Sequence, residues 1–180
     1  EHDVFQLPTF INTMMENKWL GSKTGQGFYK KIKNADGTSD ILGIDLETLE
    51  YRKSAKAKFA TLELTKSIDK VVDRFKVLVA GKDKAGEFYQ KSFGSMFAYV
   101  SKRIPEISDE LYKIDDAMKA GFGWEHGPYQ IWDAVGVKTG ISLIKELGKE
   151  PAAWVNEMLE TSIDSFYTIK DGATSYYDIP

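Results

Sequence analysis

The chain has 180 residues, of which 42% are hydrophobic and 28% are charged, as is ordinary for a globular protein. Its net charge of −3 and its lack of a Lys/Arg run give no reason to expect nucleic acid or an anionic membrane as a partner. The absence of cysteine excludes disulfides and Cys-based metal sites, and the two histidines, His2 and His126, are too few for a metal cluster of their own. No apolar run approaches the roughly 20 residues of a membrane helix, so we predict a cytoplasmic protein without a membrane span.

The first third of the chain predicts a helix followed by a hairpin. The apolar spacing predicts a helix over residues 7–18, with a proline at its start. The glycine-rich loop that follows matches neither nucleotide-binding fingerprint, so we favour a turn over a phosphate site. Residues 28–44 predict a β-hairpin that turns at Asp36-Gly37, because this dipeptide favours tight hairpin turns. Residues 45–53 form a charged connector, at which we expect a domain boundary.

Helices are predicted for most of the chain between residues 55 and 160. Ser67 is expected to cap a helix that ends at Gly81, and Ser108 is expected to cap a later one. Between them, a helix is expected over about residues 83–103. It contains Gly94 among other small residues, which predicts the close approach of a neighbouring helix.

Aromatic residues alternate with glycines from Gly121 to Gly127, in a corner between two predicted helices. The first helix ends at Gly121, and the second begins at Gly127-Pro128, where the missing N–H of proline costs nothing. The glycines let the backbone turn while the aromatic rings pack, so a stiff corner is expected. The second helix is expected to end at Gly136.

The last part of the chain predicts two short helices and a second hairpin. The helices are expected over residues 138–147 and from Pro151 onward, and the hairpin over residues 165–178 around Asp171-Gly172. This hairpin repeats features of the first one, namely a Phe-Tyr pair, a basic stretch and an Asp-Gly turn. The repetition predicts an internal duplication in which each helical unit ends in the same hairpin.

Few side chains suggest chemistry on their own. Asp115 and Asp116 are neighbours on a helix and point apart, so a solvated face is the better interpretation for both. Glu125-His126 could form an acid/base pair, but neighbouring side chains seldom orient each other as catalysis requires, and a loop histidine is favoured. The four tryptophans could line a groove for an acyl or adenine group, whereas helical spacing favours a core position for Trp132 and Trp154.

Two stretches resemble one enzyme family. ENKWLGSKTGQGFYKK, residues 16–31, resembles the segment that closes the C-terminal domain of 3-hydroxyacyl-CoA dehydrogenases. IDDAMKAGFGWEHGPYQIWDAVG, residues 114–136, resembles the helix–loop–helix of the same domain. The family pattern is matched at Asp115, Ala117, Gly121, Gly123, Gly127, Pro128, Tyr129, Asp133 and Gly136.

The resemblance implies a mainly α fold, that of the 6-phosphogluconate-dehydrogenase-C-terminal-like helical domain, with small β-hairpins. In a single-copy domain the helix–loop–helix precedes the closing segment, whereas here it follows. The chain therefore resembles the end of one copy, over residues 1–50, and a second copy, over residues 51–180. This order is similar to that of the long multifunctional bacterial enzymes, in which a Rossmann domain precedes the helical copies and an enoyl-CoA hydratase-like domain follows. We accordingly expect this chain, which opens without Met, to be a piece of a longer protein.

The function implied by the resemblance is that of an NAD-dependent oxidoreductase of fatty-acid β-oxidation, acting on 3-hydroxyacyl-CoA. The acid/base histidine and the NAD site of the family lie in the Rossmann domain, and an Asn-Arg pair of the first copy is replaced here by Gln90-Lys91. No catalytic or metal residue is therefore carried over. Trp124, His126, Gly127 and Pro128 are the candidates for contact with acyl-CoA. We expect a fragment that is inactive alone and that supports substrate binding and domain or homodimer packing; the alternative is a structural module with no ligand site.

Overall fold

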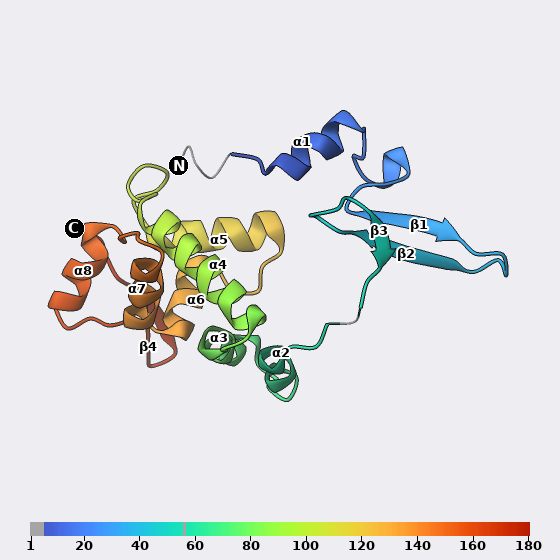
Figure 1. The fold of residues 1–180 in the computed structure, drawn as a ribbon. Helices are drawn as coiled ribbons and strands as arrows, with labels where there is room; N and C mark the ends of the chain where they lie inside the picture. The colour runs from blue at the N-terminus through green and yellow to red at the C-terminus, as the bar shows by residue number, and fades with distance from the viewer. Residues whose placement is uncertain (1–5, 56) are drawn as a thin grey trace. The chain divides into compact units, whose positions relative to one another are not determined.

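The computed structural model describes residues 6–55 and 57–180, and these form two compact units (Figure 1). The units are Glu1–Ala57, called here the N-terminal unit, and Lys58–Pro180, called the helical unit. The division lies after the third strand of the N-terminal unit. Whether it also separates two copies of one domain, as expected near residue 50, remains a prediction.

The N-terminal unit consists of one α-helix and a three-stranded antiparallel sheet. Helix α1 (Thr9–Glu16) begins after Pro8, as predicted, and a 3₁₀ turn, η2 (Ser22–Thr24), follows it. The sheet has the order β1 (Tyr29–Lys33), β2 (Ser39–Ile44), β3 (Tyr51–Lys53). The predicted hairpin is therefore confirmed, with Gly37 at φ 84° in its turn. Strand β3 was not predicted, because the charged residues between positions 45 and 53 indicated a connector.

The helical unit contains helices α2 to α8 and a two-stranded hairpin. Their bounds are α2 (Ala60–Thr65), α3 (Val71–Ala80), α4 (Lys84–Ser101), α5 (Leu111–Phe122), α6 (Pro128–Val135), α7 (Val137–Glu146), α8 (Ala153–Glu160), β4 (Tyr167–Lys170) and β5 (Ala173–Tyr176). The mainly α fold class with small hairpins is thus confirmed. No helix of the described residues is long and apolar enough to cross a membrane.

Two of the predicted helix caps are wrong. Helix α3 begins at Val71 without a side-chain cap, and the hydroxyl of Ser67 instead donates to the carbonyl of Leu64 in the preceding turn. Helix α5 begins at Leu111, and Ser108 accepts from the N–H of Glu110 within a local turn. Serine satisfies such turns as readily as helix ends, so its position alone did not decide between them.

Asp83 does cap helix α4 at the predicted start. Its carboxylate accepts from the backbone N–H groups of Gly86 and Thr61, both at 3.0 Å. These hydrogen bonds favour the ionised form and lower the pKa of Asp83 to about 2. One side chain thereby connects the start of α4 to α2.

The core lies where α4, α6, α7 and α8 meet. The indole of Trp132 stacks on the ring of Phe97 at 4.7 Å, and Phe166 of the final hairpin packs against Trp132 at 5.1 Å. Trp132 and Phe166 are fully buried and Trp154 is 8% exposed, which confirms the core positions predicted for Trp132 and Trp154. A Cβ built on Gly94 would lie 2.9 Å from the carbonyl oxygen of Leu143 in α7, so the predicted close approach is also confirmed.

Candidate functional site

The glycine-aromatic corner connects the end of α5 to the start of α6. Helix α5 extends one residue past the predicted Gly121, to Phe122, and is capped by Gly123, whose φ of 67° is left-handed and suits glycine. Helix α6 begins at Pro128 and ends before Gly136, as predicted. The backbone N–H of Gly127 donates to Oε1 of Gln130 at 3.0 Å, which satisfies one group at the helix start.

A buried carboxylate holds this corner together. Asp115 of α5 accepts from the backbone N–H groups of Tyr129 at 2.8 Å and Gln130 at 3.0 Å, so it caps α6 from a neighbouring helix. It also accepts from the hydroxyl of Tyr167 in the final hairpin at 2.9 Å. A Cβ on Gly127 would clash with Asp115, which explains why glycine stands there. The three donors fix the entry angle of α6 and bind the hairpin to it.

The solvated face predicted for both aspartates is wrong for Asp115. Asp116 is exposed and pairs with Lys119 at 2.8 Å, but Asp115 is fully buried. Burial raises the pKa of Asp115 above its ordinary value, although its hydrogen bonds act in the opposite direction. A sequence signal existed, because Asp115 follows Leu111 by four residues and so lies on the buried stripe of the helix.

Asp133 forms a second carboxylate contact with the same hairpin. It accepts from the backbone N–H groups of Phe166 at 2.7 Å and Tyr167 at 2.9 Å. Burial nevertheless raises its pKa to about 6, because the cost of removing the charge from water exceeds the gain from the two hydrogen bonds. In the sequence Asp133 matches the family pattern, but its hydrogen-bond donors lie 33 and 34 residues further along the chain, so no local signal predicts this role.

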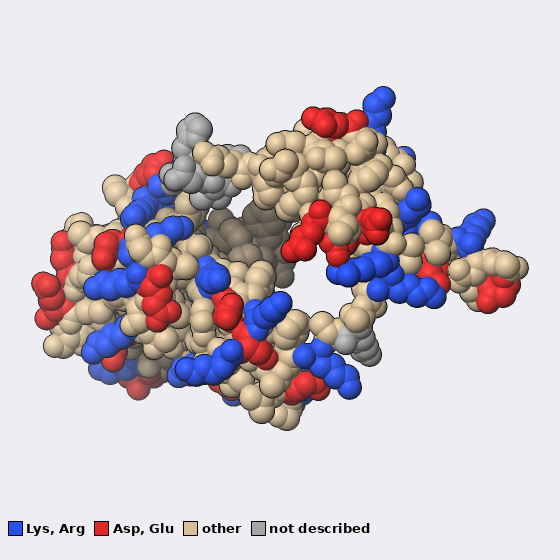
Figure 2. All heavy atoms as spheres, in the orientation of Figure 1, with Lys and Arg blue, Asp and Glu red and all other residues tan. Residues whose placement is uncertain are grey.

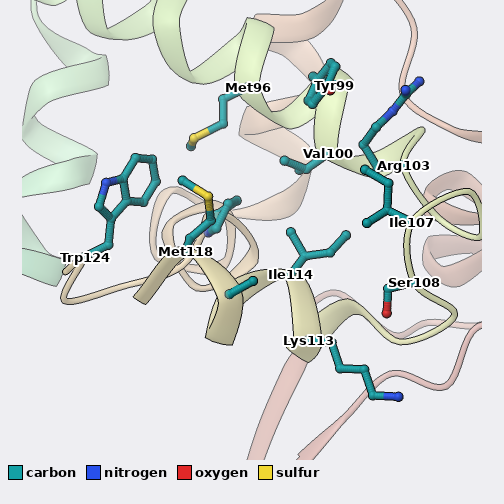
Figure 3. Close-up of a pocket in the computed structure, with 12 residues that line it drawn as sticks. Met96, Tyr99, Val100, Arg103, Ile107, Ser108, Lys113, Ile114, Met118 and Trp124 are labelled. Atoms are coloured by element: carbon teal, nitrogen blue, oxygen red, sulfur yellow. The ribbon is translucent and has the colours of Figure 1, made fainter. Parts of the chain in front are cut away.

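An apolar groove with a volume of about 530 Å³ opens beside the corner (Figure 3). Helix α4 contributes one wall and helix α5 the other, and Trp124 and Pro128 of the corner complete the lining. Met96 and Met118 lie near Trp124, and Ser108 and Lys113 lie toward the opposite end, as Figure 3 shows. The two positive side chains in the lining have acidic partners, Glu106 for Arg103 and Glu110 for Lys113. The groove therefore suits an extended apolar group better than a bare anion.

The structure distributes the four predicted site residues over different roles. Trp124, which is 38% exposed, and the buried Pro128 both line the groove. His126 lies outside it, in a smaller hollow of about 210 Å³ that Trp124 also lines. Gly127 lies beneath the corner against Asp115 and contributes packing. The structure thus brings Trp124 and Pro128 together around the groove and Trp124 and His126 together around the smaller hollow, while Gly127 lines neither.

His126 is held by an aromatic contact. Its ring meets that of Phe75 edge-on, with 6.0 Å between centroids. Its Nε2 lies 3.5 Å from Oε1 of Glu125, whose side chain is 67% exposed. A carboxylate this exposed and this distant does not orient the imidazole as a general base requires. The geometry agrees with the favoured loop-histidine interpretation.

Gln90 stands where the family resemblance places the Asn of an Asn-Arg pair in the catalytic helical copy, and here its role is structural. Its side-chain Nε2 donates to the carbonyls of Val79 at 2.8 Å and Gly81 at 3.0 Å, which satisfies the end of α3. Lys91 is exposed. Among the residues that the structure describes, no group of His, Asp and Glu could hold a metal ion. Figure 2 shows Lys and Arg interspersed with Asp and Glu on the face in view.

Comparison with known proteins matches part of the helical unit to a family. Residues 88–165 match the family model described as the C-terminal domain of 3-hydroxyacyl-CoA dehydrogenase. This range runs from within α4 to the residue before Phe166, and so includes the corner and the whole groove lining. No solved structure matches the chain.

The relatives are much longer than this chain. A Bacillus subtilis (strain 168) protein described as a probable 3-hydroxyacyl-CoA dehydrogenase is 38% identical over 178 residues, which cover 99% of this chain and 22% of that protein. A Rickettsia prowazekii (strain Madrid E) protein, described as a fatty acid oxidation complex trifunctional enzyme, is 23% identical over 79% of this chain and 18% of its own length. The chain spans about a fifth of the length of these relatives. Its residues 88–165 belong to the 3-hydroxyacyl-CoA dehydrogenase C-terminal domain family.

Proposed function

We propose that the chain is a helical part of an NAD-dependent 3-hydroxyacyl-CoA dehydrogenase of fatty-acid β-oxidation, and that it supports acyl-CoA binding without performing the oxidation. The observation that carries the proposal is the apolar groove, which lies within the family-matched unit and has Trp124 and Pro128 in its wall. We call the longer protein that would contain this chain the parent enzyme.

The groove has the properties that an acyl chain requires. Its volume of about 530 Å³ falls within the range of about 300–1,000 Å³ that is usual for small-molecule sites. The flexible side chains of Met96 and Met118 can adjust to an alkyl chain, and Trp124 offers a flat apolar surface at one end. Each methylene that leaves water contributes about 0.8 kcal/mol, so a chain of several carbons gives measurable affinity.

The oxidation itself is assigned to residues outside this chain. A dinucleotide fold needs parallel strands joined through helices, whereas the strands described here form two antiparallel sheets. These residues do not fit NAD, which we place on a Rossmann domain of the parent enzyme. We also propose that the parent enzyme contains an enoyl-CoA hydratase-like domain, forms a homodimer and lies in the cytoplasm. The relatives described as trifunctional enzymes support the presence of further domains.

Calorimetric titration of the chain with CoA and with a long-chain acyl-CoA tests the binding. We expect saturable heat with the acyl-CoA and little with CoA, because the groove recognises the alkyl part. Trp124→Ala should weaken binding by roughly tenfold, about 1.4 kcal/mol. Phe122→Ala is the matched control, since this aromatic residue is 74% exposed at the end of α5 and is not part of the groove lining. Absence of heat with any acyl-CoA would favour the alternative of a structural module without a ligand.

A spectrophotometric assay tests the division of labour. The chain mixed with NAD and a 3-hydroxyacyl-CoA should produce no NADH, because neither a nucleotide fold nor an oriented acid/base pair is present in its described residues. Clear turnover by the purified chain would contradict the proposal that it only supports binding.

A further inference from the structure

The two units contain the same helix–hairpin element, once with its apolar face covered and once without. Helix α1 carries Phe-Ile-Asn at residues 10–12 and Met-Met-Glu at 14–16, and α8 carries Trp-Val-Asn at 154–156 and Met-Leu-Glu at 158–160. The two helices match at a constant separation in sequence. Each is followed by a Phe-Tyr pair that opens an antiparallel hairpin, at residues 28–29 and 166–167.

The correspondence extends to side-chain and backbone contacts. Phe10 meets Phe28 edge-on, with centroids 6.4 Å apart and planes at 76°, and Trp154 meets Phe166 in the same way at 5.8 Å and 66°. The carbonyl of Phe28 accepts from the N–H of Ile44, as that of Phe166 accepts from Tyr177. Matching ring pairs and matching hairpin hydrogen bonds indicate one element in two places.

In the helical unit, this element is received by α6 and α5. Phe166 packs edge-on against Tyr129 and Trp132, both at 5.1 Å, and is fully buried. Asp133 accepts the backbone N–H groups of Phe166 and Tyr167, and Asp115 accepts the hydroxyl of Tyr167. Two aromatic rings and two carboxylates thus form the receiving surface.

In the N-terminal unit, the equivalent groups are exposed. Phe28 is 48% exposed and Tyr29 is 67% exposed, whereas their counterparts Phe166 and Tyr167 are buried and partly buried, respectively. A hollow of about 220 Å³ opens on the same face, lined among others by Ile11, Met14 and Phe28. Exposed apolar surface of this kind marks an interaction site.

We propose that this surface, called here the α1 face and formed by Phe10, Ile11, Phe28 and Tyr29, docks on a second helical domain of the same kind as residues 58–180. The occupant lies in the part of the parent enzyme outside this chain, and the inference rests in that respect on the proposed function. A relative is long enough to contain such a second domain, because this chain spans only 22% of the Bacillus subtilis protein. Within the parent enzyme, the N-terminal unit completes that domain as α8 and its hairpin complete the helical unit.

The chemistry of the partner surface follows from the contacts of the second copy. An aromatic pair should receive Phe28, as Tyr129 and Trp132 receive Phe166. One carboxylate should accept the N–H groups of Phe28 and Tyr29, and another should accept the Tyr29 hydroxyl. Since Phe10 stands where Trp154 stands, the partner needs no acceptor for an indole N–H, whereas Trp154 donates to the carbonyl of Ser101 at 3.0 Å.

Hydrogen exchange of the backbone amides tests this docking. The amides of Phe28 and Tyr29 are compared in the 180-residue chain and in the parent enzyme, and those of Phe166 and Tyr167 serve as the internal control. We expect the first pair to exchange at least about tenfold more slowly in the parent enzyme, while the control pair is equally protected in both. Equal exchange of Phe28 and Tyr29 in the two proteins would overturn the proposal.

A variant pair makes the test specific to the face. In the parent enzyme, Phe28→Ala should restore fast exchange at Tyr29, whereas Ile41→Ala, at an exposed position of β2, should leave it slow. Loss of protection in both variants, or in neither, contradicts docking through Phe28. Dehydrogenase activity of the parent enzyme is measured separately. Slow exchange at Phe28 and Tyr29 without dehydrogenase activity would reject the proposed function alone. Dehydrogenase activity with fast exchange at these two residues would reject the docking alone.

Discussion

At the scale of single residues, the corner depends on carboxylates whose hydrogen bonds satisfy the backbone of other segments. Asp115 joins α5, the start of α6 and the final hairpin, and Asp133 joins α6 to the same hairpin. Buried carboxylates are costly to desolvate, and they are retained where several donors would otherwise be unpaired. The position of Pro128 in the groove wall thus depends on residues that do not line the groove.

Replacing Asp115 should therefore destabilise the protein strongly. Asp115→Ala leaves two backbone N–H groups and the Tyr167 hydroxyl without their acceptor in a buried place. We expect a loss of about 2–4 kcal/mol in the free energy of unfolding measured with urea. Asp116→Ala, next to it on the exposed side and paired only with Lys119 in an i,i+3 contact, should cost less than about 0.5 kcal/mol. Similar losses for the two variants would show that the buried contacts have little energetic weight.

Asp133 should make stability depend on pH in an unusual direction. Its pKa of about 6 lies above the ordinary 3.8, so the folded state binds the proton more tightly than the unfolded state does. Its contribution is fully present below about pH 4 and is lost as the pH rises through about 6. The stability of the wild type relative to Asp133→Asn should fall by roughly 1–3 kcal/mol between pH 4 and pH 7, measured by urea unfolding at each pH. A difference that stays constant or grows with pH would refute this.

At the scale of elements, the helices pack closely where glycine removes a side chain. Gly94 brings α4 against α7, and Gly140 of α7 lies directly against the indole of Trp132, which donates to the carbonyl of Val137 at 3.1 Å. These contacts place α4 and α6 so that the groove between α4 and α5 keeps its shape. The effect of adding one methyl group to a glycine therefore depends on what that glycine touches.

Gly140→Ala and Gly121→Ala should change stability in opposite directions. A Cβ on Gly140 would clash with the Trp132 ring in the core, and such overpacking costs about 1–3 kcal/mol. A Cβ on Gly121 meets nothing within 4 Å and lies within α5, so alanine should stabilise by about 0.5–1 kcal/mol through its helix propensity. Midpoints of thermal unfolding give both values, and a stable Gly140→Ala protein would contradict the packing described here.

Sequence reasoning succeeded where a residue acts on its own neighbours. Pro8 and Pro128 at helix starts, and Asp-Gly in both hairpin turns, act within one turn of backbone, so their effects could be predicted. Strand β3, the buried state of Asp115 and the groove between α4 and α5 depend on partners distant in sequence. Charge and local periodicity contain little information about such partners. Contact of acyl-CoA with Trp124, His126, Gly127 and Pro128 stays a prediction, although Trp124 and Pro128 both line the groove. The hairpin contact of Asp133 had no local signal in the sequence.

At the scale of the whole molecule, the chain consists of a helical unit with a complete closing element and an N-terminal unit whose similar element exposes its apolar face. The helical unit contains the family-matched residues and the groove. In the proposed function, this unit supports substrate binding and other parts of the parent enzyme perform the oxidation. A binding role predicts a specific kinetic signature, because a residue that contacts only the remote part of a substrate contributes to binding in the ground state and the transition state alike.

Steady-state kinetics of the parent enzyme with Trp124→Ala test this claim most directly. NADH formation is followed at varied concentrations of a long-chain 3-hydroxyacyl-CoA, with Phe122→Ala as the control. We predict that Trp124→Ala raises KM by roughly tenfold, leaves kcat within about twofold of the wild-type value, and has a smaller effect with a short-chain substrate. A large loss of kcat at unchanged KM would assign Trp124 to the chemical step, and unchanged kinetics with every chain length would remove the groove from the substrate path.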